Sequence, residues 1–319
     1  GGVALVAVAF YLLTSLSLTF LNKAIFYDFQ FPVAVTVYQL CVSMVLLFAV
    51  GQLGLHVPSL AFIPPVRYER ALLWKLTPLA GIYVAMLALT NYCLRHVDIT
   101  FYQILRSLVI PMNIIFSFIL TGRLPSLFSS LCCLVVVGGF LLGSLTERAF
   151  TTEGFAFGVA SSATVALYSL ASKRGLEEVG RSSFRLMHYT TFVGLLLLLP
   201  VVHLSGELPG VMASPQLSSK LFWVFNTIAA VCGFGINVAF FNLINSSSPL
   251  TAHIVGCAKA ALQAWLSVMI FGNVVSPLNA LGIVLTLAGS SLYSLERHLT
   301  SAKEGDAKLA KTAGKTGRK

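Results

Sequence analysis

Leu195-Leu196-Leu197-Leu198-Leu199 and Val135-Val136-Val137 are uninterrupted apolar runs, and runs of this kind decide the fold class. The strands of a membrane β-barrel would alternate apolar and polar residues, which these runs do not. Each run lies inside a longer apolar stretch, and a helix needs roughly 20 mostly apolar residues to cross a bilayer. We count ten such stretches, at about residues 3–25, 33–53, 72–94, 98–121, 126–145, 154–174, 184–204, 219–243, 250–271 and 277–296. We therefore expect an all-α polytopic membrane protein with ten transmembrane helices, because helices satisfy their backbone hydrogen bonds internally.

The composition supports the same conclusion. Hydrophobic residues make up 57% of the chain and charged residues 10%, and the mean hydropathy is +0.86. A soluble domain carries about 25% charged residues, so this chain lacks the polar surface that water requires. We predict one transporter domain over residues 1–298 and a basic, disordered cytosolic tail over residues 299–319. The short connections leave no room for a soluble catalytic domain, and the six cysteines show no metal-ligand spacing, so we expect neither an enzyme nor a bound cofactor or metal.

The basic residues predict the orientation. Fifteen of the 21 Lys and Arg residues fall on the side of the N-terminus and four on the other side. The positive-inside rule then places both termini in the cytosol, which agrees with an even number of spans. The stretch Val3 to Ile25 is long enough to span and no basic region precedes it, so we expect a first helix and no cleaved signal. Because the chain starts at Gly1, we expect that residues before it have been trimmed.

The two halves of the chain carry a weak internal repeat. Residues 100–145 resemble residues 251–296 at a constant offset, at which Gly138 falls on Gly289 and Leu141 on Leu292. The two segments are five predicted helices apart, and five is odd, so the second half would be inverted relative to the first. Inverted repeats place a substrate site at the interface of the halves, near the midplane of the bilayer.

Two basic residues, Arg106 and Lys259, lie in the middle of predicted spans at similar depths in the two repeats. A cation there costs about 2.5–3.5 kcal/mol on insertion scales and needs a partner. All eleven acidic residues fall in predicted loops, helix ends or the tail. We therefore expect the ligand to supply the negative charge, and phosphate suits both the guanidinium fork and the ammonium. The alternative is that the two cations bond backbone carbonyls or water and only hold the halves together.

The neighbours of these cations complete the predicted site. Tyr102 lies one turn before Arg106 on the same helical face, where an aromatic ring suits a base or sugar. Gly256 and Gln263 lie one turn on either side of Lys259, and Gly256 would let a ligand approach the backbone. The predicted substrate-binding residues are Tyr102, Arg106, Tyr189, Thr190, Thr191, His253, Gly256, Lys259 and Gln263. For each residue taken singly, ordinary helix–helix packing is the alternative, and we expect His253 and His188 to be packed, neutral side chains.

Several stretches around these residues carry a family resemblance. They are Asn91-Tyr92-Cys93-Leu94-Arg95, Phe101-Tyr102, Arg106-Ser107-Leu108, Ser248-Pro249-Leu250-Thr251 and Gly256-Cys257-Ala258-Lys259-Ala260. With Leu21-Asn22-Lys23 in the first span, they resemble the nucleotide-sugar transporter and triose-phosphate translocator group of the drug/metabolite transporter superfamily. The resemblance runs to about Glu296, and the stretch that contains Lys259 is nearer to the GDP-fucose carriers than to the Gly-Ala-Leu-Asn-Lys form of the GDP-mannose carriers.

This resemblance implies a ten-helix inverted-repeat fold in the Golgi or endoplasmic reticulum membrane. It also implies an antiporter that moves a nucleotide-sugar, GDP-fucose first among them, into the lumen in exchange for the nucleoside monophosphate GMP. Tyr102 and Arg106 match the tyrosine–basic pair of the fourth helix, and Lys259 matches the phosphate-contacting lysine of the ninth. The implied partners are these nucleotides and the lipid bilayer, with no nucleic acid, and a homodimer is one assembly that the sequence allows.

The seventh span departs from the pattern of the GDP-sugar carriers. They have Phe-Tyr-Asn-Asn where this chain has His188-Tyr189-Thr190-Thr191. A carboxamide presents a donor and an acceptor together, which suits paired reading of guanine, whereas a hydroxyl does not in that geometry. GDP-mannose, a UDP-sugar and a sugar phosphate or inorganic phosphate therefore stay open as substrates. An intramembrane enzyme is disfavoured because no carboxylate lies at this depth, and a scaffold would not explain the unpaired cations.

Overall fold

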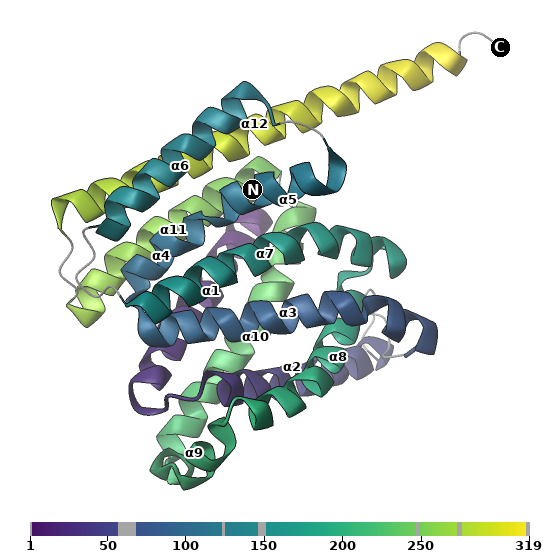
Figure 1. Cartoon of the computed structure of the whole chain (residues 1–319). Helices are drawn as coiled ribbons and strands as arrows, with labels where there is room; N and C mark the ends of the chain where they lie inside the picture. The colour runs from purple at the N-terminus through teal and green to yellow at the C-terminus, as the bar shows by residue number, and fades with distance from the viewer. Residues whose placement is uncertain are drawn as a thin grey trace.

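The computed structural model describes residues 2–56, 68–122, 125–145, 151–246, 249–272 and 276–316, and all secondary structure in these ranges is helical. The first half contains α1 (Gly2–Asp28), α2 (Pro32–His56), α3 (Arg70–His96), α4 (Ile99–Ser107), α5 (Val109–Thr121) and α6 (Leu127–Leu145). The second half contains α7 (Thr152–Glu178), α8 (Ser183–Leu204), α9 (Glu207–Ala213), the 3₁₀ helix η2 (Pro215–Ser218), α10 (Lys220–Ser246), α11 (Pro249–Phe271) and α12 (Pro277–Thr316) (Figure 1).

Most of these helices are long and apolar enough to cross a membrane. Within the described ranges nine segments meet this condition, and the apolar part of α11, Lys259–Phe271, is shorter. The polytopic all-α fold is therefore confirmed, and the count of ten spans stays a prediction. The division into a domain over residues 1–298 and a tail over 299–319 also stays a prediction, and α12 continues as a helix through this boundary to Thr316.

The predicted fourth span, residues 98–121, is not one continuous helix. It divides into α4 and α5 at Leu108, whose amide bonds the carbonyl of Leu105 at 3.2 Å, three residues back. Ser162 of α7 donates a second hydrogen bond to the same carbonyl at 2.8 Å. A break at this depth is tolerated because a neighbouring helix bonds the backbone beside it. Arg106 consequently lies in the last turn of α4, where the carbonyl end of the helix dipole favours a cation.

The packing of the helices follows a pseudo-two-fold relation. In chain order, α1, α2, α3, α4–α5 and α6 correspond to α7, α8, α10, α11 and α12. The most extensive contacts join α6 to α12, α3 to α7 and α1 to α10. Exchanging the halves maps the α3–α7 pair onto the α10–α1 pair and leaves the α6–α12 pair in place. This arrangement agrees with the predicted inverted repeat.

The pair at the symmetry axis packs through small residues. Helices α6 and α12 lie side by side along one edge of the bundle (Figure 1). A Cβ on Gly282 would come within 2.7 Å of the carbonyl oxygen of Gly139 and of the amide nitrogen of Gly143. Close backbone approach of this kind is how small residues stabilise helix pairs in lipid. The small residues of the predicted repeat therefore hold the two halves together.

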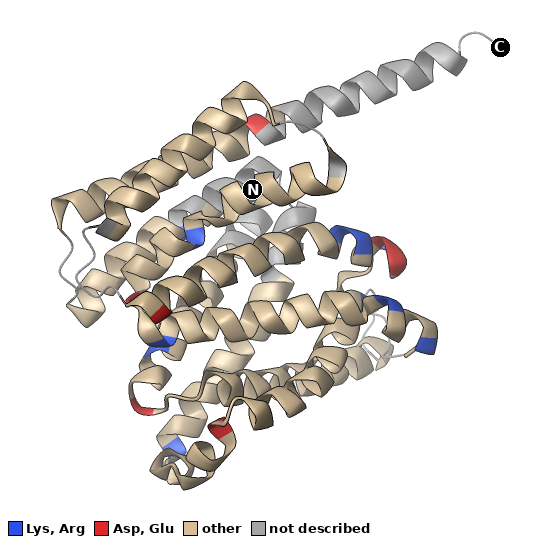
Figure 2. Ribbon diagram, in the orientation of Figure 1, with Lys and Arg blue, Asp and Glu red and all other residues tan. Residues whose placement is uncertain are grey.

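Most charged residues of the described ranges lie at or near the ends of the helices (Figure 2), and Arg106 and Lys259 are exceptions because they line a central cavity. We call the end at which α1 and α3 finish the Asp28 end, and the opposite end, at which α7 finishes and α8 begins, the Glu178 end. Exposed ion pairs occur at the Glu178 end, between Lys75 and Glu178 at 2.9 Å and between Arg185 and Glu69. The Asp28 end has a contact of 3.2 Å between His96 and Glu153, and an apolar cluster that includes Phe26, Phe29, Val97, Phe101 and Phe222 packs there.

Candidate substrate site

A cavity of about 320 Å³ lies between the two halves. Residues of α1, α2, α3, α4, α7, α8, α10 and α11 line it, so both repeats contribute. Its volume falls within the range of small-molecule sites, roughly 300–1,000 Å³. Five of the nine predicted site residues line this central cavity: Tyr102, Arg106, Thr190, Thr191 and Lys259. Tertiary packing therefore brings residues from α4, α8 and α11 to one space.

The two predicted cations both line the central cavity. Among the described residues, the guanidinium of Arg106 has one buried nitrogen, Nη1, without a hydrogen-bond partner. The Nζ of Lys259 lies 5.8 Å from the ring centroid of Tyr11, over its face. No ion pair found in the described part of the chain includes Arg106 or Lys259. A cavity with two like charges and no described counter-ion is suited to bind an anion.

Tyr102 and the break in α4 position Arg106. Tyr102 is buried, with 8% of its surface exposed, and lines the cavity one turn before Arg106. The hydroxyl of Ser162 holds the carbonyl of Leu105, the residue directly before Arg106. This contact fixes the end of α4 against α7. The guanidinium is therefore presented from a short helix whose last turn is anchored by a second helix.

Thr190 and Thr191 line the cavity from α8. The Thr190 hydroxyl donates within its own helix, to the carbonyls of Leu186 at 2.9 Å and Met187 at 3.3 Å. It therefore offers the cavity only lone pairs, as an acceptor. His188, which we expected to be packed, is buried with 3% exposure, and neither ring nitrogen has a hydrogen-bond partner among the described residues.

The other predicted residues are not among those described as lining the central cavity. Tyr189 points away from it: its hydroxyl accepts the amide N–H of Glu69 at 2.9 Å, and its ring meets that of Tyr68 edge-on at 5.6 Å. Adjacent residues of a helix face different directions, so the run from residue 188 to 191 could not all face one cavity. Gln263 is also buried elsewhere, with its Nε2 unpaired among the described residues.

Gly256 and His253 are the two remaining residues of the predicted site. Gly256 lines a second cavity of about 420 Å³ between α4, α5, α7, α11 and α12, to which Arg106 also contributes. The side chain of His253 lies outside the residues described, so its predicted role stays a prediction. Arg106 thus connects the two cavities.

The sequence reasoning missed a group of carboxamides in the central cavity. Asn22, Gln39 and Asn91 line it from α1, α2 and α3. Asn22 and Asn91 entered the sequence analysis only as parts of the motifs that carry the family resemblance. Polar side chains inside predicted spans were the signal that could have found them, because such residues face the protein interior.

Lys23 and Glu207 are buried charges outside the cavity. Lys23, near the end of α1, is buried and donates to the carbonyls of Leu94 at 3.1 Å and Val97 at 2.8 Å. The Glu207 carboxylate, at the start of α9, accepts from the amides of Val33 and Ala34 at the start of α2. Both charges meet helix ends of opposite partial charge, so their roles are structural.

The comparisons with known proteins agree with this arrangement. A sequence model of the Triose-phosphate Transporter family matches residues 2–294. The chain belongs to this family. It is 38% identical to "GDP-fucose transporter 1" of Dictyostelium discoideum, over 93% of this chain and 81% of the relative. It is 30% identical to "GDP-fucose transporter, Golgi" of Drosophila melanogaster, over 93% of this chain and 90% of the relative.

A protein of known crystal structure shares the fold. The TM-score is 0.54 and the sequence identity 15%, over 93% of this chain and 97% of that one. The family model and the two relatives, rather than this crystal structure, confirm the predicted membership of the nucleotide-sugar transporter and triose-phosphate translocator group.

Proposed function

We propose that this protein is a nucleotide-sugar antiporter of the Golgi membrane that moves GDP-fucose across it in exchange for GMP. The observation that carries the proposal is the pair Arg106 and Lys259, which face one cavity without a carboxylate partner among the described residues. Both named relatives above are GDP-fucose transporters and are at least 30% identical to nearly the whole chain.

The cavity suggests how the exchange works. A pyrophosphate between Arg106 and Lys259 would neutralise both cations, and Arg106 can donate two parallel N–H bonds to phosphate oxygens. An empty cavity leaves two buried like charges uncompensated, which opposes the reorientation of the empty carrier. A bound anion removes this penalty, so that the transporter changes conformation with one anion or the other bound. This reasoning favours exchange over uniport.

The residues that would contact the substrate are those of the predicted site that face the cavity. Arg106 and Lys259 would hold the phosphates, and Tyr102 would lie beside them. Thr190 and Thr191 would contact the base or sugar from α8. We further propose that both termini are cytosolic, as the distribution of Lys and Arg indicates, so that the Asp28 end faces the lumen.

The test is counterflow into proteoliposomes preloaded with GMP or UMP, with labelled GDP-fucose, GDP-mannose or a UDP-sugar outside. We expect uptake of GDP-fucose from GMP-loaded vesicles and background uptake from UMP-loaded or empty vesicles. Uptake driven by UMP would instead show that the threonines of α8 accompany a changed base specificity. Exchange of inorganic or triose phosphate without nucleotide exchange would contradict the proposal and indicate a phosphate translocator.

A further inference from the structure

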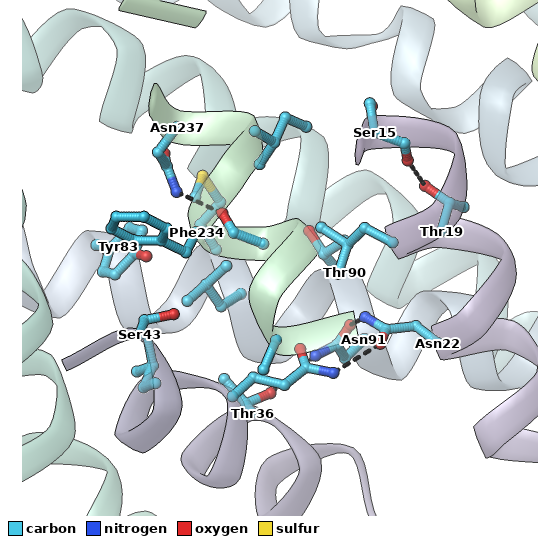
Figure 3. Close-up of a pocket in the computed structure, with 18 of the residues that line it drawn as sticks. Ser15, Thr19, Asn22, Thr36, Ser43, Tyr83, Thr90, Asn91, Phe234 and Asn237 are labelled. Atoms are coloured by element: carbon cyan, nitrogen blue, oxygen red, sulfur yellow. Dashed lines mark hydrogen bonds between the residues drawn. The ribbon is translucent and has the colours of Figure 1, made fainter. Parts of the chain in front are cut away.

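A cluster of three carboxamides forms the part of the central cavity nearest the Asp28 end (Figure 3). The Nδ2 of Asn22 donates to the Oδ1 of Asn91 at 3.3 Å, and the Nε2 of Gln39 donates to the Oδ1 of Asn22 at 2.7 Å. Asn91 donates to the hydroxyl of Thr36 at 2.8 Å, and Gln39 to Asn226 of α10 at 3.2 Å. We call Asn22, Gln39 and Asn91 the carboxamide cluster. Its side chains orient one another and are therefore held in fixed positions.

These bonds leave part of the hydrogen-bonding capacity of the cluster unused. A carboxamide has two N–H donors and an oxygen with two lone pairs. In the described part of the chain, the bonds above occupy one donor each of Asn22 and Asn91 and leave the Oε1 of Gln39 without a partner. Because all three residues line the cavity, the cluster has unused N–H donors on Asn22 and Asn91 and an unused acceptor on Gln39 available to a ligand. A hydroxyl, which donates and accepts, is complementary to such groups.

The opposite part of the same cavity has a different chemistry. The rings of Tyr83 and Tyr168 lie with their centroids 5.4 Å apart, and Met187 and Phe234 line the wall beside them. Figure 3 shows Tyr83 on the side of the cavity away from Asn22 and Asn91, with Asn237 near it. The Nδ2 of Asn237 donates to the carbonyl of Gly233 in its own helix at 2.9 Å. Nucleobases stack on aromatic rings whatever the identity of the base. The cavity is therefore divided into an aromatic part and a carboxamide part.

Helix α1 runs along the cavity from Lys259 to the carboxamide cluster. Tyr11, which lies under Lys259, and Ser15, Thr19 and Asn22 all line the cavity from this helix. A helix rises about 1.5 Å per residue, so Ser15, Thr19 and Asn22 lie about 6, 12 and 16 Å beyond Tyr11 along its axis. A pyrophosphate and a sugar laid end to end from the level of Lys259 would extend along this row of polar side chains, toward the carboxamide cluster.

We propose that the carboxamide cluster recognises the hydroxyl groups of the sugar, and that the aromatic part of the cavity takes the base. This inference rests on the proposed function, since it divides a nucleotide-sugar among three parts of one cavity. The phosphates lie at the two cations, the base stacks near Tyr83 and Tyr168, and the sugar faces Asn22, Gln39 and Asn91. Sugar specificity then comes from α1, α2 and α3, and the threonines of α8 have no part in it.

The test compares ligands with and without the sugar on the full chain purified in detergent. GMP, GDP and GDP-fucose are titrated against wild type and Gln39→Met, with ligand-induced thermal stabilisation as the readout. Gln39→Met keeps the length of the side chain and removes its hydrogen bonds. We expect the affinity for GDP-fucose to fall about tenfold, as for the loss of one or two hydrogen bonds, and the affinities for GMP and GDP to change less than twofold.

The matched control is Tyr38→Phe. Tyr38 also joins α2 to α10, through a bond of 2.6 Å to the hydroxyl of Thr227, but it is not among the described lining residues. We expect this variant to bind all three ligands like wild type. If Gln39→Met does not yield folded protein, Gln39→Asn, which withdraws the carboxamide by one methylene, replaces it with the same expectation.

Three results would overturn the inference. The affinities for GMP, GDP and GDP-fucose could fall together, which would place the cluster at the shared nucleotide. All affinities could stay unchanged while counterflow slows, which would indicate that the cluster holds the Asp28 end closed and does not bind the sugar. Wild type could bind GDP and GDP-fucose equally well, which would show that the sugar makes no net contact. A folded wild type that binds none of the guanine nucleotides would instead refute the proposed function itself.

Discussion

Two sets of buried charges in this molecule have opposite surroundings. Near the Asp28 end, Lys23 and Glu207 are each satisfied by backbone groups at helix ends. In the central cavity, Arg106 and Lys259 have no described carboxylate partner, and a guanidinium nitrogen of Arg106 is unpaired. A buried charge with good partners supports the fold, whereas one without them reduces stability and is retained for function. The comparison therefore separates structural charges from those that we propose to bind the substrate.

The largest expected effect is on transport, from the cavity cations. Arg106→Ala or Lys259→Ala should reduce GMP-driven uptake of GDP-fucose at least about 100-fold, because each removes a buried partner of the phosphates. Thermal denaturation of the purified variants should start no lower than for wild type, because the lost cation had no described carboxylate partner. Lys75→Ala, at an exposed cation, is the matched control. A variant of Arg106 or Lys259 that still exchanges at the wild-type rate would remove that residue from the site.

The next effect is on stability, from Glu207. Its carboxylate accepts from the amides of Val33 and Ala34 and from the Tyr92 hydroxyl, at 2.7 Å, so it joins α9 to α2 and α3. Glu207→Ala leaves these buried donors unpaired and should lower the free energy of unfolding by about 3 kcal/mol. Denaturation in detergent, followed by fluorescence, measures the change. An unchanged midpoint would mean that water replaces the carboxylate.

The smallest effect is expected at the Glu178 end. The ion pair of Lys75 with Glu178 is exposed, with 61% and 46% of the side-chain surfaces accessible. Exposed pairs contribute about 0.2–1 kcal/mol and are screened by salt. Glu178→Ala should therefore lower the free energy of unfolding by less than 1 kcal/mol, against about 3 kcal/mol for Glu207→Ala. Equal losses of unfolding free energy in the two variants would contradict the expected difference between an exposed ion pair at the Glu178 end and a buried carboxylate near the Asp28 end.

Much of the fold could be predicted from the sequence because lipid imposes a strict rule. Apolar stretches of spanning length must become helices, and the predicted repeat agrees with the symmetric pairing of α3 with α7 and α1 with α10. The break at Leu108 was not predicted, although Pro111 in the first turn of α5 was its signal in the sequence, because proline lacks the N–H that would bond the carbonyl of Ser107. A second helix also supports the break, because the hydroxyl of Ser162 donates to the carbonyl of Leu105 beside it. The short helix α9 was missed because it is stabilised by its contact with the start of α2.

The residues of the candidate site could be predicted where their type is costly in lipid, and neutral polar residues were harder to recognise. Arg106 and Lys259 stood out because cations are rare at that depth, and Tyr102 followed from helical periodicity. Tyr189 was placed in the site with its neighbours, but its hydroxyl bonds Glu69 at the Glu178 end instead. Asn22, Gln39 and Asn91 are neutral and were overlooked, because their importance depends on meeting one another across three helices.

The sequence by itself determined the solvent, the helical fold class, the family resemblance and the two membrane-buried cations, because each follows from composition or local pattern. Tertiary structure alone decided which of these side chains share a cavity. It turned Thr190 and Thr191 into the cavity and Tyr189 out of it, brought Lys259 over Tyr11, and joined Asn22, Gln39 and Asn91 into one cluster. The reason is physical: helical periodicity fixes which residues share a face, but only packing against other helices fixes what that face meets.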